Sequence, residues 1–331
     1  MTDLLHEMAT ARSTWTSGTV RGWYSEEELH RRFSETLADE ARWVGDADFG
    51  RGFRDAVDLP GVPDALDWAN RVVDLPGGGW AVTHLRFRLG DFTHPFVDVV
   101  ATTAPPTPDG LAQVAAAVLP AYEPFAPLSL RLEVPDGPGL LADLDADDRF
   151  GRCGLALHVV AGRVEDLRRH PRAGSYSSVR LRPTDPAGAA ERARSAYAEL
   201  ATARPQSQAW AAPEDAESLA ESADEGLLFD VLVDEHETGV VAAVRDDDHG
   251  LAGFTVKELC LDAQHRGRRL AAGALQRLID ELPARPGEVL WGTIHPDNQP
   301  SLRNALSIGR TTTSSLLWVA PASHPGMPAD P

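Results

Sequence analysis

The stretch that decides the fold runs from Phe254 to Leu282 and reads FTVKELCLDAQHRGRRLAAGALQRLIDEL. Its first part, up to Leu261, is apolar enough for a buried strand, and its last part, from Leu270, repeats apolar residues at the helical period. A short loop separates the two. The sequence therefore predicts a strand, a tight turn and a helix in direct succession.

Basic side chains crowd the start of this predicted helix: His265, Arg266, Arg268 and Arg269. The helix dipole is positive at that end, so clustered cations are unfavourable there unless an anion lies between them and the free N–H groups. The whole chain carries a formal net charge of −19, so the cluster is a local exception. The pattern indicates a phosphate-bearing ligand; arginines that extend into solvent or pair with acidic residues are the alternative.

Composition narrows the remaining possibilities. The excess of acidic residues, 50 against 31 basic ones, argues against nucleic acid or an anionic membrane surface as a partner. The two cysteines, Cys153 and Cys260, form no CxxC pair, so a zinc ribbon or a disulfide scaffold is not expected, and we expect no metal. Neither a signal-like N-terminus nor a stretch of about 20 apolar residues is present, and we expect a cytoplasmic protein.

A chain of 331 residues is long enough for about two domains. A charged stretch from Arg163 to Arg172, followed by Gly174, marks the best boundary. We therefore expect an α/β domain over residues 1–172, a second one over residues 173–320 that carries the site, and a flexible tail over residues 321–331.

The loop at 266–271, RGRRLA, resembles motif A of the GNAT superfamily of N-acetyltransferases. In that family the loop reads Arg/Gln-x-x-Gly-x-Gly/Ala, and its backbone amides hold the pyrophosphate of acetyl-CoA. Arg269 stands where the family has its central glycine, and a side chain is tolerated there if φ is helical and negative. The resemblance implies acetyl-CoA as co-substrate, bound by Arg266, Gly267, Arg268, Arg269, Leu270 and Ala271.

The downstream half is similar to motif B of the same family. Strand 289–294 is followed by HPDNQPSLRNALSIGR, in which Asn298 and Ser301 fit the opening of the motif and Arg310 replaces an aromatic residue. The resemblance implies that Asn298, Ser301 and Asn304 contact the cofactor, although Asn298 also has the features of a helix N-cap. The usual tyrosine general acid is missing, because Ala305 occupies its position.

In the family an amine attacks the thioester carbonyl directly, so it must first lose a proton. Glu258 is the candidate general base; an exposed glutamate paired with Lys257 is the other interpretation. His295 is an alternative base. The resemblance implies that a backbone N–H among Leu259, Cys260 and Leu261 stabilises the oxyanion, and a buried Cys260 thiol is expected rather than a nucleophile.

The N-terminal half has the same rhythm. Residues 96–134 read as strand, helix and strand, but the loop at 102–109 is rich in proline and has no arginine. We therefore expect two GNAT-like domains, each a mixed, mostly antiparallel sheet flanked by helices, the first being degenerate; an unrelated α/β domain is the alternative. Only one strand fits after Gly309, where the family usually has two, so we expect the first half to complete that sheet.

Together these features predict an acyl-CoA-dependent N-acetyltransferase that acts on the amine of a small molecule. The acidic balance mildly favours a cationic acceptor. A protein or peptide N-acetyltransferase is one alternative, and a CoA-binding or scaffolding protein without turnover is another.

Overall fold

The computed structural model describes residues 2–57, 59 and 61–328. The described chain forms two compact units: unit 1 contains the chain up to His158 together with Thr313–Pro328, and unit 2 contains Val159–Thr312. The charged stretch expected to separate the domains forms helix α8 (Val164–Arg169) in unit 2, where Val164 and Leu167 are buried. The first boundary therefore lies at His158, upstream of the predicted residue 172.

Unit 1 begins with short helices, α1 (Thr2–Thr14), α2 (Gly18–Arg21), α3 (Glu26–Thr36), α4 (Ala38–Arg42) and α5 (Ala47–Val57). The Ser25 hydroxyl accepts a hydrogen bond from the N–H of Glu28 at 3.2 Å and caps α3. Leu37 is the C-cap of α3 and the N-cap of α4, and it separates the two helices.

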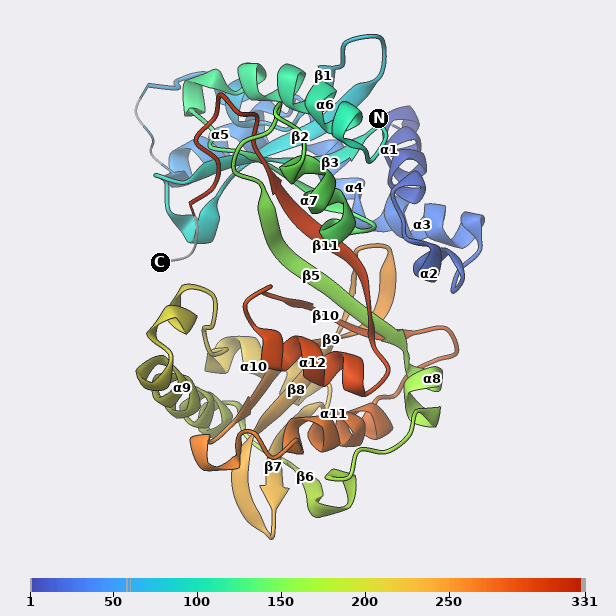
Figure 1. Cartoon of the computed structure of the whole chain (residues 1–331), viewed down its shortest axis with the longest axis vertical. Coiled ribbons are helices and arrows are strands. Elements are labelled where there is room, and N and C mark those ends of the chain that lie inside the picture. The colour runs from blue at the N-terminus through green and yellow to red at the C-terminus, as the bar shows by residue number, and fades with distance from the viewer. Residues whose placement is uncertain (1, 58, 60, 329–331) are drawn as a thin grey trace. The chain divides into compact units, whose positions relative to one another are not determined.

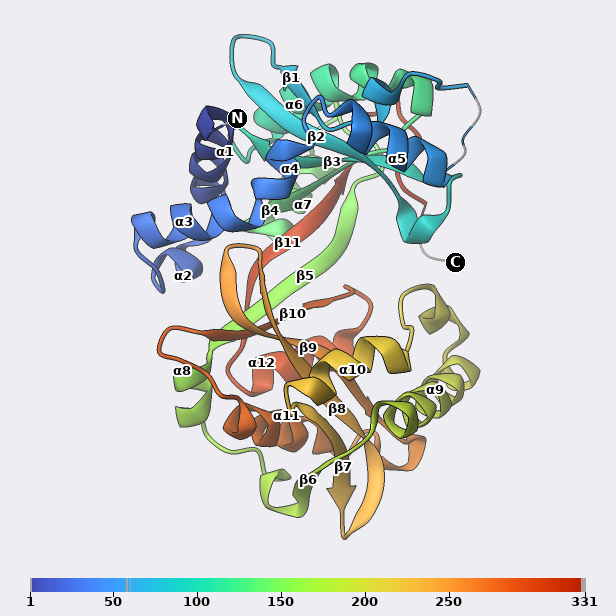
Figure 2. The same cartoon turned by 180° about the vertical axis from the view of Figure 1, so that it is seen from behind.

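The sheet of unit 1 has the strand order β1-β2-β3-β4-β11-β5. Its strands are β1 (Arg71–Asp74), β2 (Trp80–Phe87), β3 (Pro95–Thr102), β4 (Leu130–Val134), β5 (Gly154–Arg163) and β11 (Thr311–Val319). Strands β3 and β4 run parallel, whereas the neighbouring pairs β1–β2, β2–β3 and β4–β11 are antiparallel. Helices α6 (Pro108–Ala121) and α7 (Gly137–Asp145) cover one face (Figure 1), and α4 and α5 cover the other (Figure 2).

The sheet of unit 2 has the order β5-β10-β9-β8-β7-β6. Its own strands are β6 (Val179–Pro183), β7 (Leu228–Val233), β8 (His236–Asp248), β9 (Leu251–Leu261) and β10 (Val289–Ile294). Strands β9 and β10 are parallel, and β6 to β9 are antiparallel. Helices α11 (Leu270–Glu281) and α12 (Gln299–Ser307) cover one face (Figure 1); α9 (Pro186–Ala203) and α10 (Ala216–Asp224) cover the other (Figure 2).

The same order of elements occurs twice along the chain. The series β2–β3–α6–β4–α7–β5 in the first half is repeated as β8–β9–α11–β10–α12–β11 in the second. In both, the first strand pair is antiparallel with a register shift, and the next pair is parallel. The last strands are exchanged: β5 lies beside β10, and β11 pairs with β4. The predicted duplication and the predicted completion of the sheet by the first half are thus confirmed.

The segment expected to be a flexible tail packs on unit 1 over residues 321–328. The N–H of Gly326 donates to the carbonyl of Leu128 at 3.1 Å, Arg88 donates to the carbonyl of Pro328 at 2.6 Å, and Met327 is buried. The prediction was wrong for these residues, because their apolar and backbone groups find partners; residues 329–331 lie outside the described chain. Within that described chain, no helix has the length and hydrophobicity needed to cross a bilayer.

Candidate functional site

The parallel pair at the centre of unit 2 is hydrogen-bonded over only three residue pairs. Gly253, Phe254 and Thr255 of β9 face Val289, Leu290 and Trp291 of β10. The ladder then ends, although β9 continues to Leu261 and β10 to Ile294. We call the unladdered segments, residues 256–261 of β9 and 292–294 of β10, the splay. Backbone groups of β9 that face β10 have no ladder partner there, so they are available to a ligand.

A register shift next to the splay changes the face to which β9 directs its side chains. Ala242 of β8 lies opposite Glu258, but the next residue, Ala243, lies opposite Val256, so Lys257 is the extra residue of a β-bulge. Val256 packs with the core beneath α11, whereas Cys260 belongs to the core beneath α9 and α10. The bulge therefore directs Glu258 toward α9.

Glu258 is buried, with 2% of its surface exposed. Its carboxylate accepts hydrogen bonds from the hydroxyl of Tyr197 at 3.0 Å and from the N–H of Glu214 at 3.2 Å. Burial raises the pKa of Glu258 to about 7, although both hydrogen bonds act in the opposite direction. The alternative of an exposed pair with Lys257 is wrong, since the ammonium of Lys257 lies 4.0 Å from Glu221 instead.

The loop between β9 and α11 holds the predicted phosphate ligands, and Arg266 has a different role from its neighbours. Its guanidinium donates to the carbonyls of Leu261 at 2.8 Å and Ala196 at 2.7 Å, which ties the loop to the end of β9 and to α9. Arg268 and Arg269 are exposed, and neither side chain has a hydrogen-bonding or ionic partner among the residues that the structure describes. These two cations are therefore free to meet an anion.

The backbone at the central glycine position of the motif is left-handed. Arg269 has φ 60° and Gly267 has φ 74°, so the expectation of a negative φ at Arg269 is wrong. The loop keeps the conformation that favours glycine even though an arginine occupies it. Arg269 is also the N-cap of α11 and gives it no side-chain hydrogen bond. The first N–H groups of α11, from Leu270 and Ala271 onward, thus lack a side-chain acceptor, which suits an anion.

The motif at the start of α12 serves the helix itself. The side-chain oxygen of Asn298 accepts a hydrogen bond from the N–H of Ser301 at 3.2 Å, so Asn298 is an N-cap. Asn304 is half-buried on the same helix, and Ala305, in the position of the family's tyrosine, is buried against Val160 and Ile294. Whether Asn298, Ser301 and Asn304 contact a cofactor remains a prediction.

The end of β10 brings together the alternative base and a residue far away in the sequence. The ring of His295 stacks on Trp210, with ring centroids 5.4 Å apart and planes 2° apart. Trp210 lies in the segment between α9 and α10, the same segment that supplies the N–H of Glu214. Burial raises the pKa of the Cys260 thiol to about 12, in keeping with a buried thiol rather than a nucleophile.

Sequence reasoning missed Tyr197 and Trp210, and it gave Arg310 no role. Tyr197 is the only aromatic residue in the alanine-rich helix α9, which was a weak signal of a special contact. Arg310 was visible as a charge in place of an aromatic residue. Among the residues described, no group of three or more His, Cys, Asp or Glu side chains could hold a metal ion.

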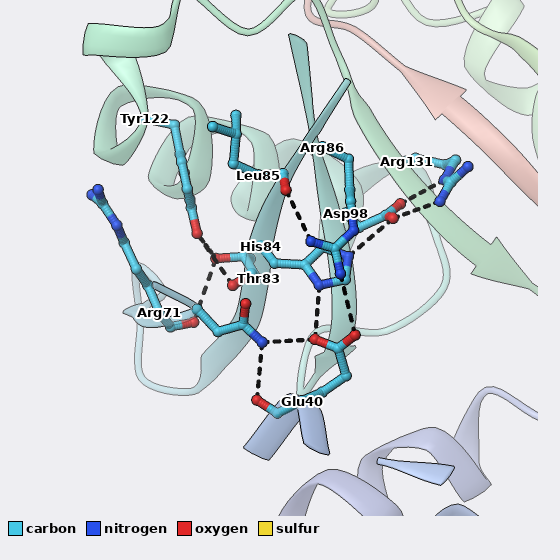
Figure 3. A network of polar contacts seen from close by, with 10 residues as sticks. Glu40, Arg71, Thr83, His84, Leu85, Arg86, Asp98, Tyr122 and Arg131 are labelled. Carbon is cyan, nitrogen blue, oxygen red and sulfur yellow. Dashed lines mark hydrogen bonds and ion pairs between the residues drawn. The ribbon is translucent and has the colours of Figure 1, made fainter. Parts of the chain in front are cut away.

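Unit 1 has a buried polar network on β2 and β3 (Figure 3). His84 lies between two carboxylates: its Nδ1 is 2.7 Å from Glu40 and its Nε2 is 3.1 Å from Asp98. Arg131 makes two 2.6 Å hydrogen bonds to Asp98, and Arg86 lies 3.5 Å from Glu40. Although burial opposes each charge, these contacts raise the pKa of His84 and lower the pKa of both Glu40 and Asp98. The charges satisfy one another, which indicates a structural network.

In unit 1, the loop that corresponds to the arginine loop caps the helix that follows it. Thr107 caps α6 by accepting a hydrogen bond from the N–H of Gly110 at 3.3 Å, and Pro108 is the first helical residue. A Cβ at Gly110 would lie 2.1 Å from the carbonyl oxygen of Pro105, so the proline-rich loop packs directly on the start of α6. The loop therefore closes the position where unit 2 leaves N–H groups open.

No family model matches the sequence, and no curated protein matches it significantly. Solved structures do match. A GCN5-related N-acetyltransferase from Sphaerobacter thermophilus is 14% identical, with a TM-score of 0.51, and the match covers 88% of this chain and 96% of that one. Another, from Kribbella flavida, is 15% identical over 86% of this chain and 95% of that one, with a TM-score of 0.43. A tandem GNAT protein from the clavulanic acid biosynthesis pathway is 17% identical over 77% and 82%, with a TM-score of 0.37. The first match and the repeated order of elements together show that this chain has the fold of the GNAT N-acetyltransferases.

Proposed function

We propose that the chain is an acyl-CoA-dependent N-acyltransferase whose site lies in unit 2, with acetyl-CoA as the simplest donor and a small-molecule amine as the acceptor. The observation that carries this proposal is the splay between β9 and β10, followed directly by the uncapped N-terminus of α11. The unpaired cations of Arg268 and Arg269 and the free N–H groups suit the pyrophosphate of CoA. The splay suits the neutral pantetheine arm of CoA, because the amides of this arm can form hydrogen bonds with backbone groups of β9 that do not pair with β10.

The reaction is a direct transfer. The amine nitrogen attacks the thioester carbonyl, the new C–N bond forms, the C–S bond breaks, and CoA leaves as the thiolate. A cationic amine loses two protons in all. Glu258 accepts the first, which frees the lone pair before the attack, and the second, lost from the nitrogen once the C–N bond has formed, protonates the thiolate to give the CoA thiol. A carboxylate with a pKa of about 7 is well matched to this role near neutral pH, because it is partly ionised and still basic. Since Glu258 is covered by Tyr197 and by the segment around Glu214, the proton reaches it through water.

The acceptor lies on the α9 and α10 side of the sheet in this proposal. Glu258 faces that side, and Trp210 and His295 stack where β10 ends. An aromatic surface beside a carboxylate suits an amine that is cationic until it is deprotonated. The net charge of −19 adds a general attraction for cationic acceptors.

A calorimetric titration with acetyl-CoA tests the donor site. The variants are Arg268→Glu, at the start of α11, and a matched control, Arg285→Glu, an exposed arginine just past the other end of the same helix. We expect the native chain and the control to bind alike and Arg268→Glu to bind about tenfold more weakly or worse, since it places a like charge beside the pyrophosphate. Equal binding by all three would remove the phosphates from this loop.

Release of the CoA thiol with a panel of amines then tests turnover. We expect amino acids, polyamines or amine-bearing natural products to support steady release, and peptides with a lysine or a free N-terminus to do so poorly. Fast release with peptides instead would point to a protein acetyltransferase. Binding without release for any amine would identify a CoA-binding protein that has no transferase activity.

A further inference from the structure

Arg310 places a guanidinium at the splay. The residue follows α12, is only 4% exposed, and donates from Nη2 to the carbonyl of Val160 at 2.8 Å. A Cβ built on Gly292 of β10 would lie 3.2 Å from the same Nη2 and 3.9 Å from Cβ of Val256 in β9. Gly292 and Val256 are the first residues past the end of the β9–β10 ladder. The guanidinium therefore occupies the space beside Gly292 where the splay begins.

In the part of the chain that the structure describes, no carboxylate pairs with Arg310, and its buried Nε has no hydrogen-bond partner. Burial lowers the pKa of Arg310 to about 9, which leaves it charged at neutral pH. Asp230, a buried carboxylate of the same unit, is by contrast paired with both Arg182 and Arg192. An unpaired buried charge is strongly unfavourable unless a ligand completes it.

The position of Arg310 indicates on which side its partner enters. Val256 belongs to the core beneath α11, so the guanidinium lies on the α11 and α12 side of the sheet, whereas Glu258 faces the opposite side. The donor's phosphates are assigned to the start of α11. The pantetheine arm that would follow the splay has no charge, so the part of the donor able to bring an anion to Arg310 is the acyl group itself.

We propose that Arg310 binds the carboxylate of an acidic acyl group, so that the preferred donor is an ω-carboxyacyl-CoA, such as malonyl-CoA or succinyl-CoA, rather than acetyl-CoA. The planar guanidinium fork is suited to a carboxylate, with two N–H donors on two oxygens. This inference rests on the proposed function, since it names the donor class of the same site.

The test compares binding of succinyl-CoA and butyryl-CoA, which have four acyl carbons each but differ in the carboxylate. The proteins are the native chain, Arg310→Met and the control Arg303→Met, which removes an exposed arginine from helix α12, just before Arg310 in the chain. We expect the native chain and the control to prefer succinyl-CoA by about tenfold or more, and Arg310→Met to lose that preference while still binding butyryl-CoA. Should Arg310→Met fail to fold, Arg310→Gln replaces it, because glutamine can keep a donor for the carbonyl of Val160 without the charge.

Melting temperature separates this role from a structural one. Removing an unpaired buried charge should leave the melting temperature of Arg310→Met unchanged or higher. A marked fall, together with a preference for succinyl-CoA that survives in the variant, would assign Arg310 to the fold and overturn the inference.

Other outcomes are equally distinct. If butyryl-CoA and succinyl-CoA bind equally to the native chain, the inference is overturned and the proposed function stands. If neither thioester binds, the inference is overturned, and the acetyl-CoA titration decides separately whether the proposed function stands. The anion that binds Arg310 could also come from the acceptor. Two acceptors test this with butyryl-CoA as donor: an amine that carries a carboxylate, and the same amine with that carboxylate converted to an amide. If Arg310→Met slows the reaction of the carboxylate-bearing amine alone, the anion belongs to the acceptor and the assignment to the donor is overturned.

Discussion

The β3–β4 pair of unit 1 and the β9–β10 pair of unit 2 have the same backbone arrangement, but the charged side chains around them are paired in unit 1 and unpaired in unit 2. Both are parallel pairs hydrogen-bonded over three residue pairs, next to a register shift in the neighbouring strand pair. In unit 1, charged groups on these strands are mutually paired, and a proline-rich loop packs on the helix that follows. In unit 2 the start of α11 has no side-chain cap, and Arg268, Arg269 and Arg310 have no counter-ions among the residues that the structure describes.

The backbone alone does not make a site in this chain. Topology provides a parallel pair whose ladder ends early, and it does so twice. What differs is whether the side chains complete one another. His84, Asp98 and Arg131 do so, and their network is finished without a ligand. Among the described residues, Arg268, Arg269 and Arg310 have no carboxylate that completes them in this way, so unit 2 is the half whose cations lack counter-ions.

The largest expected effect comes from removing the base in unit 2. Glu258→Gln should lower kcat/KM by about a hundredfold or more, because the amine loses its proton acceptor. The native kcat/KM should rise as pH increases through about 7, where Glu258 loses its proton, and this rise should be absent in the variant. Steady-state thiol release between pH 5.5 and 9 measures both.

The control for this prediction is Glu221→Gln, which removes an exposed carboxylate on α10 near Lys257. It should leave the pH profile unchanged.

Stability provides a second readout. The folded pKa of Glu258 is raised, so its ionised form is disfavoured by folding and the native chain should lose stability as pH rises from about 4.5 to about 7. Glu258→Gln should therefore be the more stable protein at pH 8, by about 2 kcal/mol. A variant with native activity would show that another group is the base.

The second effect concerns the finished network of unit 1. His84→Leu should reduce the free energy of unfolding by about 3 kcal/mol, because two buried carboxylates lose a shared cation. Acetyl-CoA affinity measured on folded protein should stay unchanged. His6→Leu, on the exposed part of α1, is the control.

The pH dependence of this loss has a definite sign. Contacts with Asp98 and Glu40 raise the folded pKa of His84, so its stabilisation is fully present below about pH 6.5 and disappears as pH rises through that folded pKa. Chemical denaturation of both proteins at pH 6 and at pH 9 should show a larger difference at pH 6. A loss of CoA binding in folded His84→Leu would break the comparison, since unit 1 would then take part in the site.

Local signals made much of the fold predictable. Strand 289–294 begins and ends as the sequence indicates, and helix α11 begins at Leu270, where the apolar residues take up the helical period, because such periodicity is a local feature. The doubled strand–helix rhythm was also readable. The boundary of the first unit, predicted at residue 172 and found at His158, was not readable, because the core in which Val164 and Leu167 are buried decides whether the charged stretch is a linker or a short helix.

The site was less predictable, for reasons of three-dimensional contact. Glu258 and the arginine loop stand out in the sequence, but burial of Glu258 depends on a bulge at Lys257 and on Tyr197, which is 61 residues away. Arg266 looks like a phosphate ligand until its guanidinium is seen on the carbonyls of Leu261 and Ala196. Such roles depend on which partners the tertiary structure supplies.

Asn298 can serve as the N-cap of α12 or as a ligand contact, and substitutions distinguish these two roles. Asn298→Ala should lower the free energy of unfolding by about 1 kcal/mol, since the N–H of Ser301 loses its acceptor. Asn298→Asp, which preserves the acceptor, should restore stability. Acetyl-CoA affinity should be close to native in both folded variants if the residue serves only the helix. An affinity loss of about tenfold in Asn298→Ala, with stability unchanged, would instead sharpen the contrast with unit 1 by adding Asn298 to the donor site.

The smallest effect tests whether the arginine loop of unit 2 is kept open at a cost. Arg269 holds φ at 60°, a conformation that is unfavourable for a residue with a Cβ by about 1 kcal/mol, and glycine removes that penalty. Arg269→Gly should therefore raise the free energy of unfolding by about 0.5–1 kcal/mol. Glycine also gives the unfolded chain more conformational entropy, and this offsets part of the gain. Arg268→Gly, at a neighbouring residue without a positive φ, should gain nothing. If Arg269→Gly is more stable but binds CoA more weakly, the strained conformation at Arg269 places a cation that the ligand needs. If CoA binding is unchanged, the side chain of Arg268 is sufficient. The conformation of the loop, rather than its second charge, then distinguishes unit 2 from unit 1.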